Sequence, residues 1–310
     1  MLGRAPFRAV RPFATLAALA LLCTGFVAIK PSGASAAATV RGAYGGSTAD
    51  LKAAGFNTVN AGASRSSLDA LHAIGMKAVI WLGSYRDSCS FDLTDDEIRQ
   101  KVGAVAGHPA ILAYQISDEP EKEYRDECPG AVQQHRDRTK LIHGLDPGKP
   151  TYTVIATWDG VDAYPYRHWV GATDIMGLDV YPCRYNSPTC SFGMIDKAIA
   201  AAAAAGVPRY WGVVQAFGDG YYRMPTGAEI AEQLRRWGAS RMEGYFAYHW
   251  SQQASWMVDW LAKYPTAVDV VRRFNGASPS RSFIDRRRAT RISYVRWPSP
   301  GSGTPLTARR

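Results

Sequence analysis

Three carboxylates gather at the end of one apolar stretch of the 310-residue chain. Residues 110–117 have the apolar character of a buried strand, and Asp118, Glu119 and Glu121 follow directly. A carboxyl group in apolar surroundings keeps its proton to a higher pH and can then act as a general acid. Pro120 restricts the backbone immediately after Glu119. We therefore predict that Glu119 is a general acid and that Glu121 is a solvated surface charge.

The stretches around this strand repeat one pattern, in which a short apolar strand is followed by a polar loop and an amphipathic helix. Ala-Gly or Ile-Gly often ends the helix, as a left-handed C-terminal cap requires. Strands are predicted at residues 40–44, 58–61, 77–82, 110–117, 151–156, 174–180, 209–215 and 243–248. Helices are predicted at residues 48–54, 67–74, 131–143, 195–205 and 226–238, with another beginning at Thr94 in a capping box with Glu97. Residues 257–274 are predicted to close the ring.

Eight such units in residues 37–275 predict an α/β protein with a single (β/α)8 TIM barrel, for which this length is typical. A doubly wound open sheet is the alternative. It would need fewer strands and usually a Gly-rich phosphate-binding loop, and the sequence contains no such loop.

The N-terminal end of the chain has the composition of an export signal. Residues 1–36 combine three early arginines, an apolar run at residues 13–29 and the small residues of Ala34-Ser-Ala36. This order predicts a cleaved signal peptide and a secreted, extracellular protein with no stable membrane anchor after cleavage. An uncleaved membrane anchor is the alternative, because the apolar run is just long enough to span a bilayer.

Most of the positive charge lies at the two ends of the chain. The formal net charge is +9; residues 1–36 carry +4 and residues 276–310 carry +7, which leaves −2 for residues 37–275. A nearly neutral body gives no support for a nucleic-acid partner. Residues 276–310, rich in Arg, Ser, Pro and Gly, are predicted to be a basic, disordered tail. Weak contact of this tail with anionic surfaces is a further hypothesis, and the sequence indicates no oligomeric state.

Four cysteines remain after signal cleavage, and an even number in an exported protein predicts disulfide bonds. Cys183 and Cys190 lie in one loop and are predicted to pair. Cys89 and Cys128 would then join the loops after the third and fourth strands. Their spacing is not that of a zinc site, and no His/Glu cluster has metal-ligand spacing. We therefore predict neither a metal nor a cofactor.

Polar and aromatic residues gather at the predicted C-terminal ends of the strands, where TIM barrels carry their active sites. Such a set suits a carbohydrate, because aromatic rings stack on its C–H faces while amides and carboxylates bind its hydroxyls. Asp159 and Asp219 lie in loops beyond their strands and are predicted to be solvated. The candidate substrate-binding residues are Tyr44, Asn60, Trp81, Asp118, Trp158, Tyr181, Gln215, Phe217, His249 and Trp250. Helix capping by Asp118 and a core position for His249 are the structural alternatives.

Two of these strand ends resemble a known family. Asp118-Glu119-Pro120 on strand four resembles the Asn-Glu-Pro of glycoside hydrolase clan A barrels, with Asp in place of Asn. His249-Trp250 on strand eight is similar to the tryptophan that floors the sugar site in that clan. The resemblance spans roughly residues 40–275. It implies hydrolysis of O-glycosidic bonds in a poly- or oligosaccharide, with Glu119 as the general acid.

Strand seven departs from the clan, which places its nucleophilic glutamate where this sequence has Gln215. Asp179, at the end of strand six, could replace it as nucleophile or base. Alternatively, Gln215 could hold an assisting group of the substrate, or the barrel could be a pseudoenzyme that binds glycans without cleaving them. We favour Asp179, which shares a strand face with Gly177 and Tyr181; a structural Asp179 bonded to backbone or arginine is its alternative. A gap of about 5–5.5 Å between the carboxyls of Glu119 and Asp179 would indicate retention, and about 6.5–9.5 Å inversion.

Overall fold

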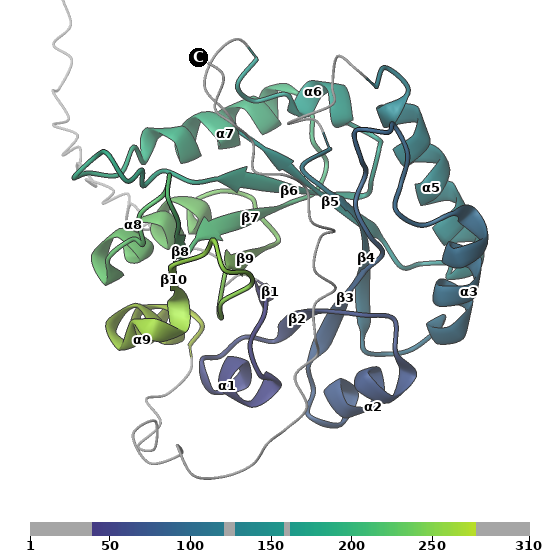
Figure 1. Ribbon diagram of the computed structural model, residues 1–310, viewed down its shortest axis with the longest axis horizontal. Coiled ribbons are helices and arrows are strands. Elements are labelled where there is room, and N and C mark those ends of the chain that lie inside the picture. The colour runs from purple at the N-terminus through teal and green to yellow at the C-terminus, as the bar shows by residue number, and fades with distance from the viewer. Residues whose placement is uncertain (1–38, 121–127, 158–161, 277–310) are drawn as a thin grey trace, which may run out of the picture. The chain divides into compact units, whose positions relative to one another are not determined.

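Eight parallel strands form a closed barrel in this computed structural model, which describes residues 39–120, 128–157 and 162–276 (Figure 1). The strands are β1 (Val40–Ala43), β2 (Thr58–Ala61), β3 (Lys77–Trp81), β4 (Ile111–Asp118), β5 (Thr151–Ala156), β6 (Ile175–Val180), β7 (Tyr210–Gln215) and β9 (Gly244–Tyr248). Each strand pairs with the next, and β9 closes the ring by pairing with β1. The predicted (β/α)8 TIM barrel is confirmed. The predicted signal peptide, nearly all of the predicted tail, Glu121, Trp158 and Asp159 lie outside the described residues.

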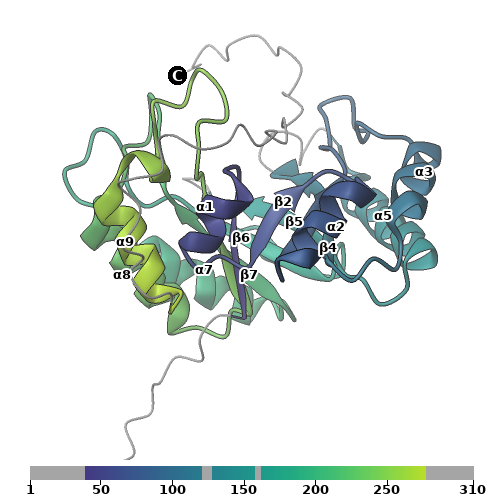
Figure 2. The same cartoon turned by 90° about the horizontal axis from the view of Figure 1, so that it is seen from below.

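Helices surround the strands, as Figures 1 and 2 show. They are α1 (Thr48–Ala53), α2 (Arg65–Ala73), α3 (Asp95–Val105), α5 (Ala131–Leu145), α6 (Tyr166–Trp169), α7 (Gly193–Ala204), α8 (Gly227–Gly238) and α9 (Pro265–Phe274). The predicted capping box of Thr94 and Glu97 is present at the start of α3. Between β5 and β6, the one described helix is the four-residue α6.

The segment predicted to close the ring has three parts rather than one. Strand β10 (Asp259–Trp260) and the short 3-10 helix η1 (Leu261–Lys263) precede α9. Strand β10 pairs antiparallel with β8 (Phe217–Gly218), which follows β7. This small sheet connects the chain after β7 to the chain after β9, and so links two segments at the C-terminal end of the barrel.

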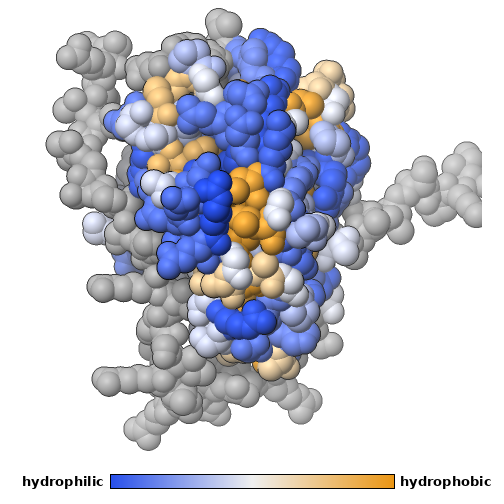
Figure 3. Space-filling model, turned by 90° about the vertical axis from the view of Figure 1, so that its right-hand side faces the viewer, coloured by the Kyte–Doolittle hydropathy of each residue, from blue (hydrophilic) through white to orange (hydrophobic). Residues whose placement is uncertain are grey.

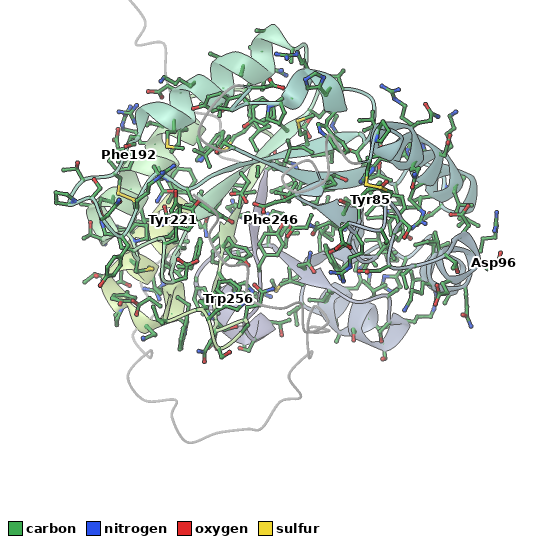
Figure 4. All side chains as sticks on the ribbon, turned by 45° about the horizontal axis from the view of Figure 1, so that its top comes forward. Tyr85, Asp96, Phe192, Tyr221, Phe246 and Trp256 are labelled. Carbon is green, nitrogen blue, oxygen red and sulfur yellow. A yellow bond between two sulfur atoms is a disulfide. The ribbon has the colours of Figure 1, made fainter. Side chains whose placement is uncertain are left out.

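The barrel interior is filled by side chains and is not a channel. Its core consists of Tyr44, Val79, Ala113, Tyr152, Val154, Ile175, Trp211, Val213 and Phe246. The Tyr152 ring lies 4.7 Å from that of Trp211, whose ring lies 5.5 Å from Phe246, the residue labelled near the barrel centre in Figure 4. At position 177 on β6 only glycine fits, because a Cβ there would lie 2.5 Å from the Tyr152 hydroxyl. The ring of Tyr152 therefore occupies the space that a larger residue on β6 would need.

A second hydrophobic layer lies between the strands and the helices, with Leu68, Ile98 and Trp237 among its fully buried members. The face that carries α3 and α5 is mostly hydrophilic at its surface, with a narrow apolar strip (Figure 3). Within the described residues, no helix combines the length and hydropathy needed to cross a membrane.

Both predicted disulfides are present. Cys89, in the loop after β3, is bonded to Cys128, which precedes α5, across 39 residues of sequence. Cys183 is bonded to Cys190 within the loop between β6 and α7. Both bonds therefore restrain loops that follow strands, at the end of the barrel where TIM-barrel chemistry takes place.

Candidate active site

A pocket of about 240 Å3 lies at the C-terminal ends of the strands. Its lining consists of four carboxylates, six aromatic residues and two valines: Tyr44, Asp118, Glu119, Val154, Asp179, Tyr181, Val213, Phe217, Asp219, Tyr222, Tyr248 and Trp256. A larger groove, of about 460 Å3, runs between α8 and α9 and contains no carboxylate. Because all of its lining residues belong to α8 and α9 and none follows a barrel strand, the smaller pocket is the candidate active site.

Strand β4 brings two of the carboxylates to the pocket through local irregularities of its backbone. The register with β5 shifts between Gln115 and Ser117, as a bulge does when it redirects the residues that follow. Asp118 is exposed at the strand end, and Glu119 behind it is half-buried. Glu119 adopts the left-handed conformation, with φ of 44°, and its N–H donates to the Val154 carbonyl at 3.0 Å. A non-glycine residue in this region costs about 1–3 kcal/mol, and such strain tends to collect at functional sites.

Asp179 lies near the end of β6 and is almost completely buried, with 4% of its surface exposed. The Thr157 N–H and hydroxyl both donate to the Asp179 carbonyl, at 3.1 and 3.0 Å. The Asp179 carboxyl oxygen Oδ1 is buried and has no hydrogen-bond partner. Burial raises the pKa of Asp179 well above its ordinary value, because the charged form loses its hydration.

The Glu119 and Asp179 carboxyl groups interact with each other. After burial, the charge of Glu119 is the next cause of the raised Asp179 pKa, followed by a hydrogen bond between the two side chains. Two carboxyl groups can share a hydrogen bond only when one of them carries a proton. Burial favours Asp179 as the protonated member in the free protein.

Tyrosine side chains form much of the remaining wall. The Tyr181 ring packs against Phe217, Tyr222 and Tyr248, at centroid distances of 4.9, 5.2 and 6.0 Å. Burial raises the pKa values of Tyr181 and Tyr248, and the nearby carboxylates raise them further. Both hydroxyls therefore stay protonated at neutral pH. The Tyr248 hydroxyl donates to Gln253 Oε1, and the Tyr181 hydroxyl hydrogen-bonds the Asp179 side chain. The Tyr44 hydroxyl lies 3.3 Å from that of Tyr152, at the boundary between pocket and core.

Gln215 is one of the predicted substrate-binding residues, and the structure places its side chain outside the pocket. It is fully buried and does not line the pocket. Its Oε1 accepts from the Cys183 N–H at 2.8 Å, and its Nε2 donates to the carbonyls of Cys183 and Arg223, each at 2.9 Å. Both amide hydrogens are thus used on the backbone. The residue holds the disulfide loop against β7 and offers no amide hydrogen to a substrate.

Four further residues predicted to bind substrate do not line the pocket. Asn60 donates to the Gln115 side chain at 2.7 Å, and Trp81 ends β3 outside the lining. His249 is 4% exposed, burial lowers its pKa to about 4, and its ring hydrogen-bonds the Ser251 carbonyl. Trp250 is buried and packs edge-on against Phe56, in the outer core rather than on a sugar-binding floor. The structure brings Tyr44, Asp118, Glu119, Asp179, Tyr181 and Phe217 together in the pocket.

Four aromatic or acidic lining residues were not among the predicted site residues: Asp219, Tyr222, Tyr248 and Trp256. Asp219 was predicted to be solvated, but it is half-buried and its Oδ1 accepts from the backbone N–H groups of Tyr221 and Tyr222. Tyr248 is the last residue of both the predicted strand and β9, but the prediction took the two residues after it, His249 and Trp250, as site residues. Tyr222 and Trp256 come from loops and carry no periodic sequence signal.

The fold and the pocket together define a (β/α)8 barrel with a carboxyl pair, Glu119 and Asp179, at the C-terminal ends of its strands. No family model and no curated protein matches the chain. Solved structures do match, and glycosidases are among them by their descriptions. A putative α-L-fucosidase from Bacteroides thetaiotaomicron aligns with a TM-score of 0.55 at 11% identity, over 77% of this chain and 94% of its own.

An endo-β-1,4-mannanase from Thermotoga petrophila aligns with a TM-score of 0.53 at 12% identity, over 76% of each chain. β-Glucuronidase 2 from Bacteroides uniformis aligns with a TM-score of 0.51 at 12% identity, over 68% of this chain. The chain spans only 30% of that enzyme's length. These similarities establish the barrel fold, which this chain has in common with glycoside hydrolases.

Proposed function

We propose that the protein is a secreted glycoside hydrolase that cleaves O-glycosidic bonds of a poly- or oligosaccharide by a retaining mechanism. The observation that carries the proposal is the presence of the Glu119 and Asp179 carboxyls, close enough to interact, in one aromatic pocket at the C-terminal ends of the strands. A close approach is nearer to the separation of about 5–5.5 Å in retaining enzymes than to the roughly 6.5–9.5 Å that leaves room for a water molecule in inverting enzymes.

The pair has the proton and the charge that such a reaction requires. Asp179 lies deep in the pocket and would attack the anomeric carbon as a carboxylate, while half-buried Glu119 would protonate the departing oxygen. A glycosyl ester on Asp179 would result. Glu119, now ionised, would take a proton from water, whose oxygen would attack the anomeric carbon and release Asp179.

One proton transfer has to come before this attack. Burial places the shared proton on Asp179 in the free protein, yet the nucleophile must be ionised. Because the two side chains share a hydrogen bond, the proton can pass to Glu119 without rearrangement of the backbone. Substrate binding would drive this transfer if it stabilises the charge on Asp179.

Secretion is part of the same proposal. Disulfides persist in oxidising compartments and are rare in the cytosol. The bonds Cys89–Cys128 and Cys183–Cys190 support export, in agreement with the N-terminal sequence.

A screen of polysaccharides and aryl glycosides tests the activity, and Glu119→Gln tests the assignment. The substitution keeps the shape of the side chain but removes the acid, so kcat should fall about 10²–10⁴-fold. Glu243→Gln is the matched control, because Glu243 lies at the opposite end of β9, where it pairs with Arg209. Full turnover by Glu119→Gln would refute the role of Glu119. Glycan binding without any cleavage by the unmodified protein would favour the pseudoenzyme.

A further inference from the structure

The exposed apolar and aromatic side chains are concentrated at one end of the barrel. Within the described ranges five large side chains of this kind are exposed. One of them, Ile74, directly follows α2. The other four lie in loops after the C-terminal ends of barrel strands: Tyr185, Tyr221, Trp256 and Val258. Single exposed apolar residues are ordinary, but a group of them beside a pocket marks a binding surface.

Aromatic rings lead from the pocket to this surface. The Tyr222 ring lines the pocket; it lies 5.2 Å from the Tyr181 ring and 4.8 Å from the Tyr221 ring, to which it is nearly perpendicular. Tyr221 is 53% exposed, and the Tyr185 N–H donates to its carbonyl at 2.8 Å. Tyr185 itself is 72% exposed. The aromatic wall of the pocket therefore continues onto the outer surface.

Trp256 extends the same surface from a second loop. It lines the pocket and is also 49% exposed, so it lies at the edge of the pocket. Strand β10 pairs with β8, and the Val258 N–H donates to the Gly218 carbonyl at 3.0 Å, so the loop of Trp256 runs beside the segment that leads to Tyr221. In Figure 4, Tyr221 and Trp256 lie on the same side of the barrel centre, which Phe246 marks.

The loop that carries Tyr185 is held in place by covalent and hydrogen bonds. The Cys183–Cys190 disulfide closes this loop. The Arg223 N–H donates to the Cys183 carbonyl at 3.2 Å, and the Arg223 guanidinium donates to the Ser187 carbonyl at 3.0 Å. Aromatic side chains on a loop that is ordered before the ligand arrives lose less conformational entropy on binding.

A sugar chain is the ligand that fits both the pocket and this surface. Aromatic faces stack on the C–H faces of sugar rings. The pocket has a volume of about 240 Å3, which is less than the roughly 300–1,000 Å3 of pockets that enclose a drug-sized ligand. It can therefore enclose only a small part of a polysaccharide, and the other units have to lie outside it. The exposed rings are placed to receive them.

We propose that Tyr185, Tyr221 and Trp256 form an aromatic platform that binds further units of a polysaccharide whose reacting unit occupies the pocket. This inference rests on the proposed function, whose substrate class it narrows to chains that extend beyond the pocket. A small glycoside could fill the pocket without contact with Tyr185 or Tyr221. A longer chain contacts both rings, so affinity should increase with chain length.

Native affinity electrophoresis of the Glu119→Gln protein, which is expected to cleave slowly, measures this binding. Each gel contains one of four neutral polysaccharides: mixed-linkage β-glucan, glucomannan, arabinoxylan or galactan. At least one of them should retard the protein. Tyr185→Ala and Tyr221→Ala, each added to this background, should weaken the affinity for that polysaccharide about 2–12-fold, as the loss of one stacked ring predicts. Failure of all four to retard the protein, or undiminished retardation of both alanine variants, would overturn the proposal.

Two matched controls separate ring stacking from other effects. Tyr185→Phe keeps the ring and removes the hydroxyl, so retardation should persist. A loss as large as that in Tyr185→Ala would contradict stacking. Ile74→Ala shortens an exposed apolar side chain that precedes β3, at the opposite end of the barrel, and should leave the affinity unchanged. An equal loss in Ile74→Ala would also overturn the proposal.

A second copy of the chain and a short glycan are the alternative occupants. Size-exclusion chromatography that shows a dimer, dissociated by Tyr185→Ala, would assign the surface to a second copy and overturn the platform. Calorimetry compares oligosaccharides of two and six units prepared from the retarding polysaccharide. The longer one should bind at least about fourfold more tightly, because it reaches two further rings. Equal affinities would refute the inference.

Failure of this inference differs from failure of the proposed function. Cleavage of a glycan by the unmodified protein, with equal activity in Tyr185→Ala and Tyr221→Ala on the polymer, would refute the platform and leave the hydrolase intact. Retardation that depends on these two rings, without turnover of any glycan, would refute the hydrolase and leave the platform intact.

Discussion

Replacing Asp179 by Asn should stabilise the folded protein at neutral pH and at the same time abolish turnover. The Asp179 pKa is raised above its ordinary value of 3.8 by burial and then by Glu119. As the pH rises past 3.8, the unfolded chain loses this proton more readily than the folded chain does, so ionisation favours the unfolded state. The stability that a neutral Asp179 provides is complete below pH 3.8, and it falls as the pH rises towards the folded pKa.

The size of the effect follows from the proton that the folded protein retains. Asparagine cannot ionise, and its amide can donate to the Glu119 carboxylate in place of the shared proton. Each pH unit over which the folded protein keeps a proton that the unfolded chain has lost costs about 1.4 kcal/mol, and asparagine avoids this cost. For a domain of this size, each kcal/mol moves the midpoint of thermal unfolding by about 2–4 °C. We therefore expect Asp179→Asn to raise the midpoint at pH 7 by about 3–6 °C for each such unit and to lose this advantage near pH 3.8.

Asp174, immediately before β6, is a matched control, because its pKa is shifted in the opposite direction from that of Asp179. Its Oδ2 accepts from the Thr151 N–H at 2.7 Å and from His143 Nε2 at 2.8 Å. Burial opposes the shift, but these hydrogen bonds lower the pKa of Asp174, so its charge stabilises the fold above its ordinary pKa of 3.8 and this contribution is lost as the pH falls. Asp174→Asn should cost about 1–3 kcal/mol at pH 7 and progressively less in acid.

Circular dichroism melts of both variants at neutral and acid pH, together with glycosidase assays, provide the measurement. Opposite pH dependences for the two substitutions are expected. If Asp179→Asn lowers the midpoint at pH 7 as Asp174→Asn does, Asp179 is an ionised structural carboxylate and does not share a proton with Glu119. Retained turnover in Asp179→Asn would instead refute its role as nucleophile.

Three further substitutions test other parts of the site. Gln215→Glu introduces the carboxylate expected at strand seven but places it against the backbone carbonyls of Cys183 and Arg223. Thermal melts should therefore show lower stability, and assays should show no gain in kcat. A gain in kcat would mean that a carboxylate on strand seven can take part in the reaction. Trp256→Ala should raise KM about 2–12-fold with kcat nearly unchanged, by loss of about 0.5–1.5 kcal/mol of ring stacking; unchanged KM would exclude Trp256 from binding. Thr157→Val removes a hydroxyl that holds the Asp179 backbone, so kcat should fall while KM changes little, and a shift in KM alone would contradict a positioning role.

The barrel could be predicted from sequence because each strand and helix carries its own local signal. The predicted strand 151–156 coincides with β5, and the predicted start of the sixth strand at Asp174 is one residue before Ile175. The sheet of β8 and β10 could not be predicted, because each strand has two residues and so shows no alternation. Its pairing of Phe217 with Trp260 depends on the closed barrel that brings these segments together.

The site was predictable only where a strand end positions the side chain. Glu119 directly follows β4, and Asp179 lies near the end of β6, the next strand but one in the closed barrel, so their shared pocket follows from that topology. Gln215 also ends a strand, but its hydrogen bonds reach Cys183, 32 residues away, and no local pattern indicates that partner. Trp256 reaches the pocket from a loop whose course depends on tertiary contacts.

Because of where the two disulfides lie, the barrel can form before the loops around the candidate site are restrained. Cys89, Cys128, Cys183 and Cys190 all lie in loops that follow strands, and none lies within a strand of the closed barrel. The hydrogen-bonded ring of strands can therefore close while the thiols are still reduced. Oxidation then restrains the loops around a barrel that already exists, and Gln215 is in place to receive the loop of Cys183. In this order of events, a chain held in a reducing compartment would have a folded barrel, but the loops at the C-terminal ends of its strands would not yet be restrained by disulfides.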